Sequence, residues 1–260
     1  MAPIVGGVLG LLLVTSLTNP AVVWQGYILL AAVSVSCIGL FLLVLREYPL
    51  RPHEVAPFHW HSFLSGFVWP LAHRDFTCVL LSRGLIFLSF TLLGAYTFFY
   101  LSQALHMTPG AAAFGVTTFQ LISNGALIVS AWGTRCAAER VQRLKPFLMG
   151  EALLMATGLS IIALLPVWSA ILLAAIFFGG GFGAFVGLDI ALAIQVLPHA
   201  TERGKDLGIL HTAIFVPLIV SSLIGAAILN TVHSFAMLFA VAAFASLLAA
   251  LFILSVKSVR

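Results

Sequence analysis

Residues 170–197 read AILLAAIFFGGGFGAFVGLDIALAIQVL, and the single ionisable residue of this apolar run is Asp189. A helix that crosses a bilayer needs roughly 20 mostly apolar residues, because only hydrogen bonds within the helix satisfy its backbone in hydrocarbon. The run is long enough to do so. Other runs of the same character lie at 3–17, 23–45, 77–101, 111–132, 147–165, 207–230 and 235–256. The pattern predicts an all-α, polytopic membrane protein with about eight transmembrane helices.

The composition supports the same class of protein. Hydrophobic residues make up 62% of the 260 residues, and charged residues only 8%. Such values lie far from those of soluble globular domains, so a soluble enzyme is not expected. The net charge of +4 comes from bases scattered among short gaps, where they would face lipid headgroups rather than nucleic acid. The three cysteines are far apart and indicate neither a disulfide framework nor a zinc site.

The gaps between the apolar runs alternate in charge. The gaps at 46–74, 135–145 and 203–205 and the tail at 257–260 carry Lys and Arg, whereas those at 18–25, 103–109, 165–169 and 230–234 carry no charged residue. Basic residues are retained on the cytoplasmic side of a membrane. We therefore expect a multi-pass protein of the cytoplasmic (inner) membrane with both termini in the cytoplasm.

The longest gap, at 46–76, divides the chain unequally. Residues 1–45 hold two expected spans and residues 77–260 hold six, which are expected to form one bundle. The gap itself mixes prolines, aromatic residues and histidines, a composition typical of a connector that lies in the membrane interface. A metal-binding or proton-sensing cluster is the less favoured alternative, because neighbouring histidines two residues apart on a helix point in different directions. The histidines are His53, His59, His61 and His73.

The six later spans form two groups of three, at 77–165 and 170–256, which begin on opposite sides of the membrane. Two such groups in tandem predict inverted-topology repeats, on which many secondary transporters are built. The segment at 179–187 reads GGGFGAFVG but no Lys-Ser/Thr follows it, so nucleotide binding is not expected. Its small residues instead favour close approach of a neighbouring helix.

Three ionisable residues fall within the expected spans: Arg83, Glu151 and Asp189. Arg83 and Asp189 reach similar depths from the same side, since Arg83 lies about 12 Å beyond Asp75 and Asp189 about 13 Å before Pro198. An unpaired charge there costs about 3 kcal/mol, so we expect an Arg83–Asp189 pair, or Asp189 in a water-filled cavity as a proton or cation site. A pair that only locks two helices together is an equal alternative.

Other polar residues have less definite roles. Glu151 lies closer to the inner interface and could reach it, or pair with a base there such as Lys145. Neutral polar groups inside the spans could line a cavity or join helices. The candidates are Tyr96, Gln120 and Asn124.

Two inner gaps resemble those of the major facilitator superfamily. One gap contains Gly133, Arg135, Glu139, Arg140, Arg143 and Lys145, a pattern similar to the family's Gly-x-x-x-Asp-Arg-x-Gly-Arg motif. The other contains Leu197 and Pro198, then Arg203-Gly204-Lys205-Asp206-Leu207-Gly208-Ile209, then Ala213 and Pro217. This second gap is similar to the loop between the tenth and eleventh helices of sugar-type members, the sucrose and melibiose permease-like groups.

The resemblance implies that residues 77–260 are the carboxy-terminal bundle of a twelve-helix transporter. The first two spans then correspond to its fifth and sixth helices, and about four helices are absent from the amino end. It also implies secondary active transport of a small solute such as a sugar, by alternating access with H⁺ or Na⁺. Inner-gate contacts would come from Arg135, Glu139, Arg140, Arg143, Arg203, Lys205 and Asp206.

Several alternatives stay open. The same bases could serve only to orient the chain in the membrane. A non-transporting scaffold or sensor is a second class of function, and a membrane-embedded enzyme is a third and less favoured one. We expect no enzymatic activity, cofactor, metal or nucleic acid, and we expect lipid as a partner.

Overall fold

The computed structural model describes residues 23–44, 72–141, 144–196 and 203–256, and these residues form helices and turns without any strand. The chain divides into two compact units, Met1–Phe63 and Leu64–Arg260, each of which is described by itself. Within the described residues, seven helices are long and apolar enough to cross a membrane. The all-α, polytopic membrane class expected from the apolar runs is therefore confirmed.

In the first unit the structure describes one helix, α2 (Val23–Val44), which carries no charged residue. Its bounds match the expected span at 23–45. A helix that is apolar all round suits a surface of lipid rather than water. The expected span at 3–17 and residues 46–71 of the expected connector, with His53, His59 and His61, lie outside the described residues.

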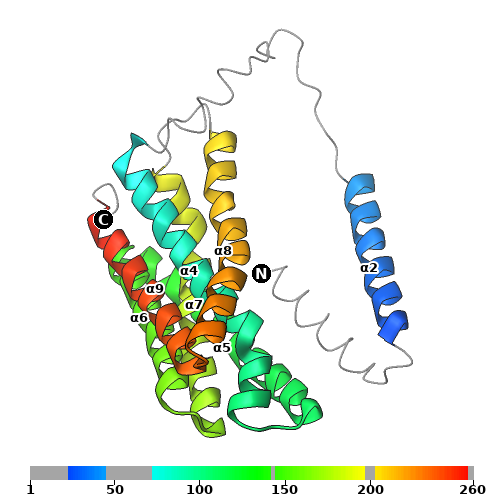
Figure 1. The fold of residues 1–260 in the computed structure, drawn as a ribbon. Coiled ribbons are helices and arrows are strands. Elements are labelled where there is room, and N and C mark those ends of the chain that lie inside the picture. The colour runs from blue at the N-terminus through cyan, green and yellow to red at the C-terminus, as the bar shows by residue number, and fades with distance from the viewer. Residues whose placement is uncertain (1–22, 45–71, 142–143, 197–202, 257–260) are drawn as a thin grey trace. The chain divides into compact units, whose positions relative to one another are not determined.

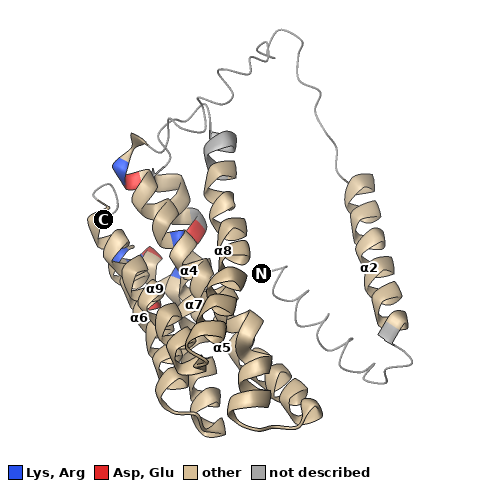
Figure 2. Ribbon diagram, in the orientation of Figure 1, with Lys and Arg blue, Asp and Glu red and all other residues tan. Residues whose placement is uncertain are grey.

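The second unit is a bundle of antiparallel helices in which successive elements alternate in direction (Figure 1). Tight turns at 105–108, 165–167 and 232–234 join them at one end. These turns carry no Lys, Arg, Asp or Glu, and the charged residues gather toward the opposite end (Figure 2). The helices are α4 (Arg74–Phe99), the π-helical turn η4 (Tyr100–Ala104), α5 (Pro109–Val141), α6 (Lys145–Leu164), α7 (Trp168–Val196), α8 (Arg203–Thr231) and α9 (Phe235–Ser255).

The start of α4 and the end of α5 differ from the expected bounds. α4 begins at Arg74, with His73 as its N-cap, so the last residues of the expected connector are helical. α5 continues to Val141, and Gly133, Arg135, Glu139 and Arg140 lie on this helix rather than in a loop. Ala, Arg and Glu after Gly133 have high helix propensity, and Arg140 in the last turn interacts favourably with the helix dipole.

The helices pack in a pattern with an internal symmetry. The main contacts join α5 to α7, α6 to α7, α6 to α9, α4 to α9 and α4 to α8. This set is unchanged when α4 is exchanged with α7, α5 with α8 and α6 with α9. That equivalence is the one expected of inverted repeats, α4–α6 and α7–α9, which begin at opposite ends of the bundle.

The contact between α5 and α7 is a backbone-to-backbone contact along a stripe of glycines. Gly179, Gly183 and Gly187 of α7 face Ser123, Leu127 and Ala131 of α5, and a Cβ on any of these glycines would meet the α5 backbone. Glycines four residues apart lie on one face of a helix and let a second helix approach closely. The close packing expected of residues 179–187 is confirmed.

Buried serine side chains form hydrogen bonds in the contact between α9 and α4. Ser246 of α9 donates a hydrogen bond from Oγ to Ser89 Oγ of α4 at 2.9 Å. Ser89 Oγ in turn donates to the carbonyl oxygen of Ala242 at 2.7 Å. Both serines are fully buried, so these bonds satisfy hydroxyls that would otherwise be costly in an apolar core.

Candidate functional site

The bundle contains a buried ion pair between α4 and α7. Arg83 Nη2 lies 2.9 Å from Asp189 Oδ2, and the side chains are 6% and 17% exposed. Arg83 lies about 14 Å along the axis from Arg74, and Asp189 about 10 Å from Val196, at the helical rise of 1.5 Å per residue. The pairing of Arg83 with Asp189 is therefore confirmed, and it joins the first helices of the two repeats.

The hydrogen-bonding groups of the Arg83–Asp189 pair are not all satisfied. Arg83 Nε is buried and has no hydrogen-bond partner in the described part of the chain. Asp189 also interacts electrostatically with Glu151 of α6 and with His211 of α8. A buried guanidinium with a free N–H and an acid with a partly exposed side chain form a polar site that can exchange partners.

A stripe of phenylalanines continues from the ion pair along both helices. On α4 it includes Phe87 and Phe90, and on α7 it includes Phe178, Phe182 and Phe185. Phe90 stacks on Phe182 with ring centroids 4.3 Å apart, and Phe87 meets Phe182 and Phe185 edge-on at 5.8 Å. We define the α4–α7 seam as these residues: Arg83, Phe87, Phe90, Phe178, Phe182, Phe185 and Asp189.

The seam is an arrangement of side chains that the sequence analysis missed. Its residues recur at spacings of three and four on each helix, which places them on one face. That spacing, anchored on Arg83 and Asp189, is the signal that could have found the phenylalanines.

Glu151 of α6 lies in a different environment from the one expected. It is 1% exposed, and both of its carboxyl oxygens are buried without a hydrogen-bond partner among the described residues. The expectation that it reaches the inner interface or pairs with a base there is therefore wrong. Lys145 lies one and two-thirds turns earlier on α6, so it is on a different face of that helix. The face that carries Glu151 is covered by α7, which packs so closely that a Cβ on Gly181 would lie 2.6 Å from the Glu151 carbonyl oxygen.

The neutral polar candidates do not join the ion pair. Tyr96 of α4 donates its hydroxyl to the Ser222 carbonyl of α8 at 3.2 Å, which favours a helix-joining role. Gln120 and Asn124 are half-buried one turn apart on α5. Neither makes a hydrogen bond to Arg83 or Asp189 within the described ranges.

The expected inner-gate residues are only partly described. Arg135 Nε contacts Glu139 Oε1 at 3.2 Å, but both residues belong to α5 and their side chains are 72% and 67% exposed. This contact joins neighbouring turns of one helix, and Arg140 nearby is exposed. Arg143 lies outside the described residues, as do the side chains of Arg203, Lys205 and Asp206.

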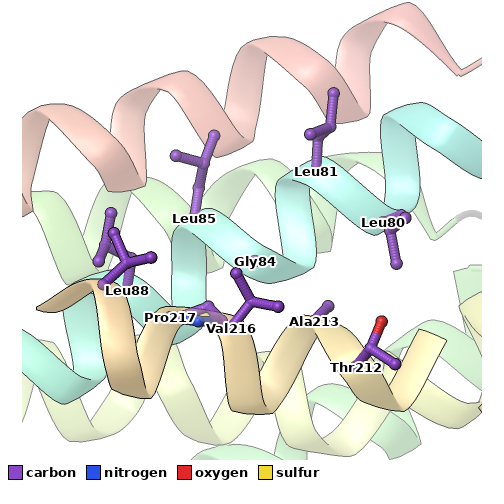
Figure 3. A pocket seen from close by; sticks show the side chains of 10 residues that line it. Leu80, Leu81, Gly84, Leu85, Leu88, Thr212, Ala213, Val216 and Pro217 are labelled. Atoms are coloured by element: carbon purple, nitrogen blue, oxygen red, sulfur yellow. The ribbon is translucent and has the colours of Figure 1, made fainter. Parts of the chain in front are cut away.

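An apolar cavity of about 300 Å³ lies between α4 and α8. Figure 3 shows Leu80, Gly84 and Leu88 of α4 across it from Thr212 and Pro217 of α8. A Cβ on Gly84 would have open space around it. The cavity suits an apolar group, since its lining offers little to satisfy the hydroxyls of a polar solute.

In the described part of the chain, no group of three or more His, Cys, Asp and Glu residues is placed to hold a metal ion. No protein-family model matches the sequence, and no curated protein matches it either.

Proposed function

We propose that the chain is a secondary active transporter that moves a small polar solute, of the sugar class, across the cytoplasmic membrane by alternating access. The two inverted repeats would act as a bundle of the major facilitator type. The observation that carries this proposal is the buried Arg83–Asp189 pair, which joins the leading helices of the repeats well inside the apolar part of the bundle.

Charge this deep is costly in a membrane unless it is paired or hydrated. A purely structural contact could be made more cheaply by apolar packing, as α5 and α7 do along their glycines. A pair with a free Arg83 N–H and a partly exposed Asp189 is suited to bind a polar solute or an ion in one state and to close in the other.

The α4–α7 seam supports the same mechanism. On one side of the pair lie the charged ends of the helices, and on the other lies the phenylalanine stack. In alternating access, one barrier opens while the other stays closed. In this mechanism water and solute can separate Arg83 from Asp189, so the ion pair is the barrier that opens. The phenylalanine stack is the barrier that excludes water and solute.

The test is uptake by the purified protein in liposomes. A panel of radiolabelled monosaccharides and disaccharides is offered under an imposed H⁺ or Na⁺ gradient. We expect one or more sugars to accumulate, and Asp189→Asn to abolish accumulation while the protein still elutes as a folded species. Failure of the folded wild-type protein to take up any sugar of the panel under either gradient would contradict the proposal.

A further inference from the structure

Among the described residues, the buried acid Glu151 has no counter-charge of its own. Its residue is 1% exposed, and its Oε1 and Oε2 atoms find no hydrogen-bond partner in the part of the chain that is described. A buried carboxylate normally keeps paired charges or hydrogen-bond donors, because an isolated charge is far more costly to bury than a neutral acid. The group therefore needs a neutralising partner that binds to it directly.

Within the described ranges, the helices that make the main contacts with α6 offer no base to Glu151. α6 packs on α7 and α9. The one ionisable residue of α7 is Asp189, and α9 has none. Asp189 is an acid that already uses Arg83, and its charge acts unfavourably on a carboxylate at Glu151. Arg83 and His211 of α8 both act on Asp189, whereas Glu151 has no such basic group among its interactions with the described residues, so a proton on Glu151 is what neutralises it.

A proton suits this site better than a metal cation. A hard cation needs several oxygen ligands in place of its water shell, whereas a proton needs only one carboxyl oxygen. The Glu151 residue is only 1% exposed, which leaves little room for a hydrated ion at its carboxyl group. Because the Glu151 side chain leans toward the start of its helix, it also leans toward the charged end of the bundle.

We propose that Glu151 is a proton-binding site, which is protonated in the conformation seen here and exchanges its proton with water when α7 moves away from α6. On release, the O–H bond of the Glu151 carboxyl breaks, the proton passes to water and the carboxylate stays on the protein. Coupling of this proton to solute movement rests on the proposed transport function. The binding of the proton itself does not.

Infrared spectroscopy of the full-length protein in lipid tests the proton directly. A protonated carboxyl has a carbonyl stretching band that a carboxylate lacks. At near-neutral pH we expect this band in the wild type, with a frequency that shifts when glutamate is ¹³C-labelled. Glu151→Gln should remove the band, whereas Glu139→Gln, at an exposed and paired acid, should leave it in place.

Two results would overturn the assignment: absence of the band in folded wild-type protein, or its persistence in Glu151→Gln. If Glu151→Gln fails to fold, Glu151→Asp decides the matter. In that variant the band should move and should no longer respond to ¹³C-glutamate. A band that still responds belongs to another glutamate and contradicts the proposal.

A second measurement tests the coupling. With the sugar that the wild-type liposomes accumulate, Glu151→Gln should still exchange labelled for unlabelled sugar above the level of empty liposomes. Under a proton gradient it should not raise the internal concentration above the external one. Proton-driven accumulation equal to wild type contradicts the coupling role. Absence of all uptake by the wild type instead contradicts the transport proposal, and the infrared result then stands alone.

Discussion

The interfaces α5–α7 and α4–α8 occupy equivalent places in the two repeats but are packed in opposite ways. Along α5–α7 the backbones touch over three glycines, and Ser130 Oγ of α5 donates a hydrogen bond of 2.6 Å to the Gly180 carbonyl of α7. Along α4–α8 an apolar cavity of about 300 Å³ lies between residues 80–88 and 212–220, and close packing is confined to the other end, where the Tyr96 ring lies against Gly225 (Figure 3). The same topology thus holds one dense and one loose contact.

The difference in packing indicates which of the two helix contacts can separate more readily. In a membrane, helices associate largely through van der Waals packing, and atoms that line a void lose part of it. Separation of α4 from α8 therefore costs less than separation of α5 from α7. The Arg83–Asp189 pair links α4, on the loose side, to α7, on the dense side. We expect α5 and α7 to move as a unit, with rearrangement at the contacts that this unit makes with α4 and α6.

The largest effect should come from breaking that link. Arg83→Ala leaves Asp189 without its counter-charge, and we expect a loss of about 3 to 5 kcal/mol in the free energy of unfolding. Arg83→Gln with Asp189→Asn removes both charges and should recover most of the loss. Titration of detergent-solubilised protein with a denaturing detergent measures both. Equal losses in the single and double variants would show that the two residues do not act as a pair.

A smaller effect is expected at the dense interface. Gly183→Ala places a methyl group against the Leu127 backbone, so α5 and α7 must separate. Overpacking of this kind costs about 1 to 3 kcal/mol. The same denaturation experiment measures it, with Gly84→Ala as the matched control in an open position. An unchanged free energy of unfolding in Gly183→Ala would mean that α5 and α7 are not in backbone contact.

Loss of single hydroxyls should distinguish a half-buried hydrogen bond of the α4–α8 contact from a fully buried one between η4 and α6. Tyr96→Phe removes a bond to Ser222 at a half-buried place on α4–α8, and we expect a cost of about 0.5 kcal/mol. Tyr100→Phe removes a buried bond of 3.1 Å to the Ile162 carbonyl of α6, and we expect about 1.5 kcal/mol. Comparison of the two unfolding free energies is the test, and the reverse order would contradict the contrast.

The smallest effect has the opposite sign. Gly84→Ala adds a methyl group in the open space of the α4–α8 cavity and removes a flexible residue from a helix. We expect stabilisation by about 0.5 to 1 kcal/mol. Thermal unfolding in detergent measures the shift, and destabilisation would indicate that α8 packs closer to α4 than it does here.

Much of the fold was predictable because it depends on local properties. The apolar run at 207–230 predicted α8 to within a few residues, since span length follows from bilayer thickness. The end of α5 was not predicted, because bases were interpreted as a loop although Ala, Arg and Glu favour helix. The Arg83–Asp189 pair was predictable because the two residues lie at similar depths in their spans. A charge that deep in a membrane is costly unless an opposite charge lies close to it.

Composition, span length and charge placement are properties of the sequence by itself, and they determined the membrane class, the order of helices and the charged end of the bundle. The environment of Glu151 and the contrast between the two interfaces depend on how each helix is rotated about its axis and which helix it meets. A rotation of one residue turns a side chain by about 100°. Tertiary packing therefore decided that Glu151 is isolated from Lys145 and that Phe90 lies on Phe182.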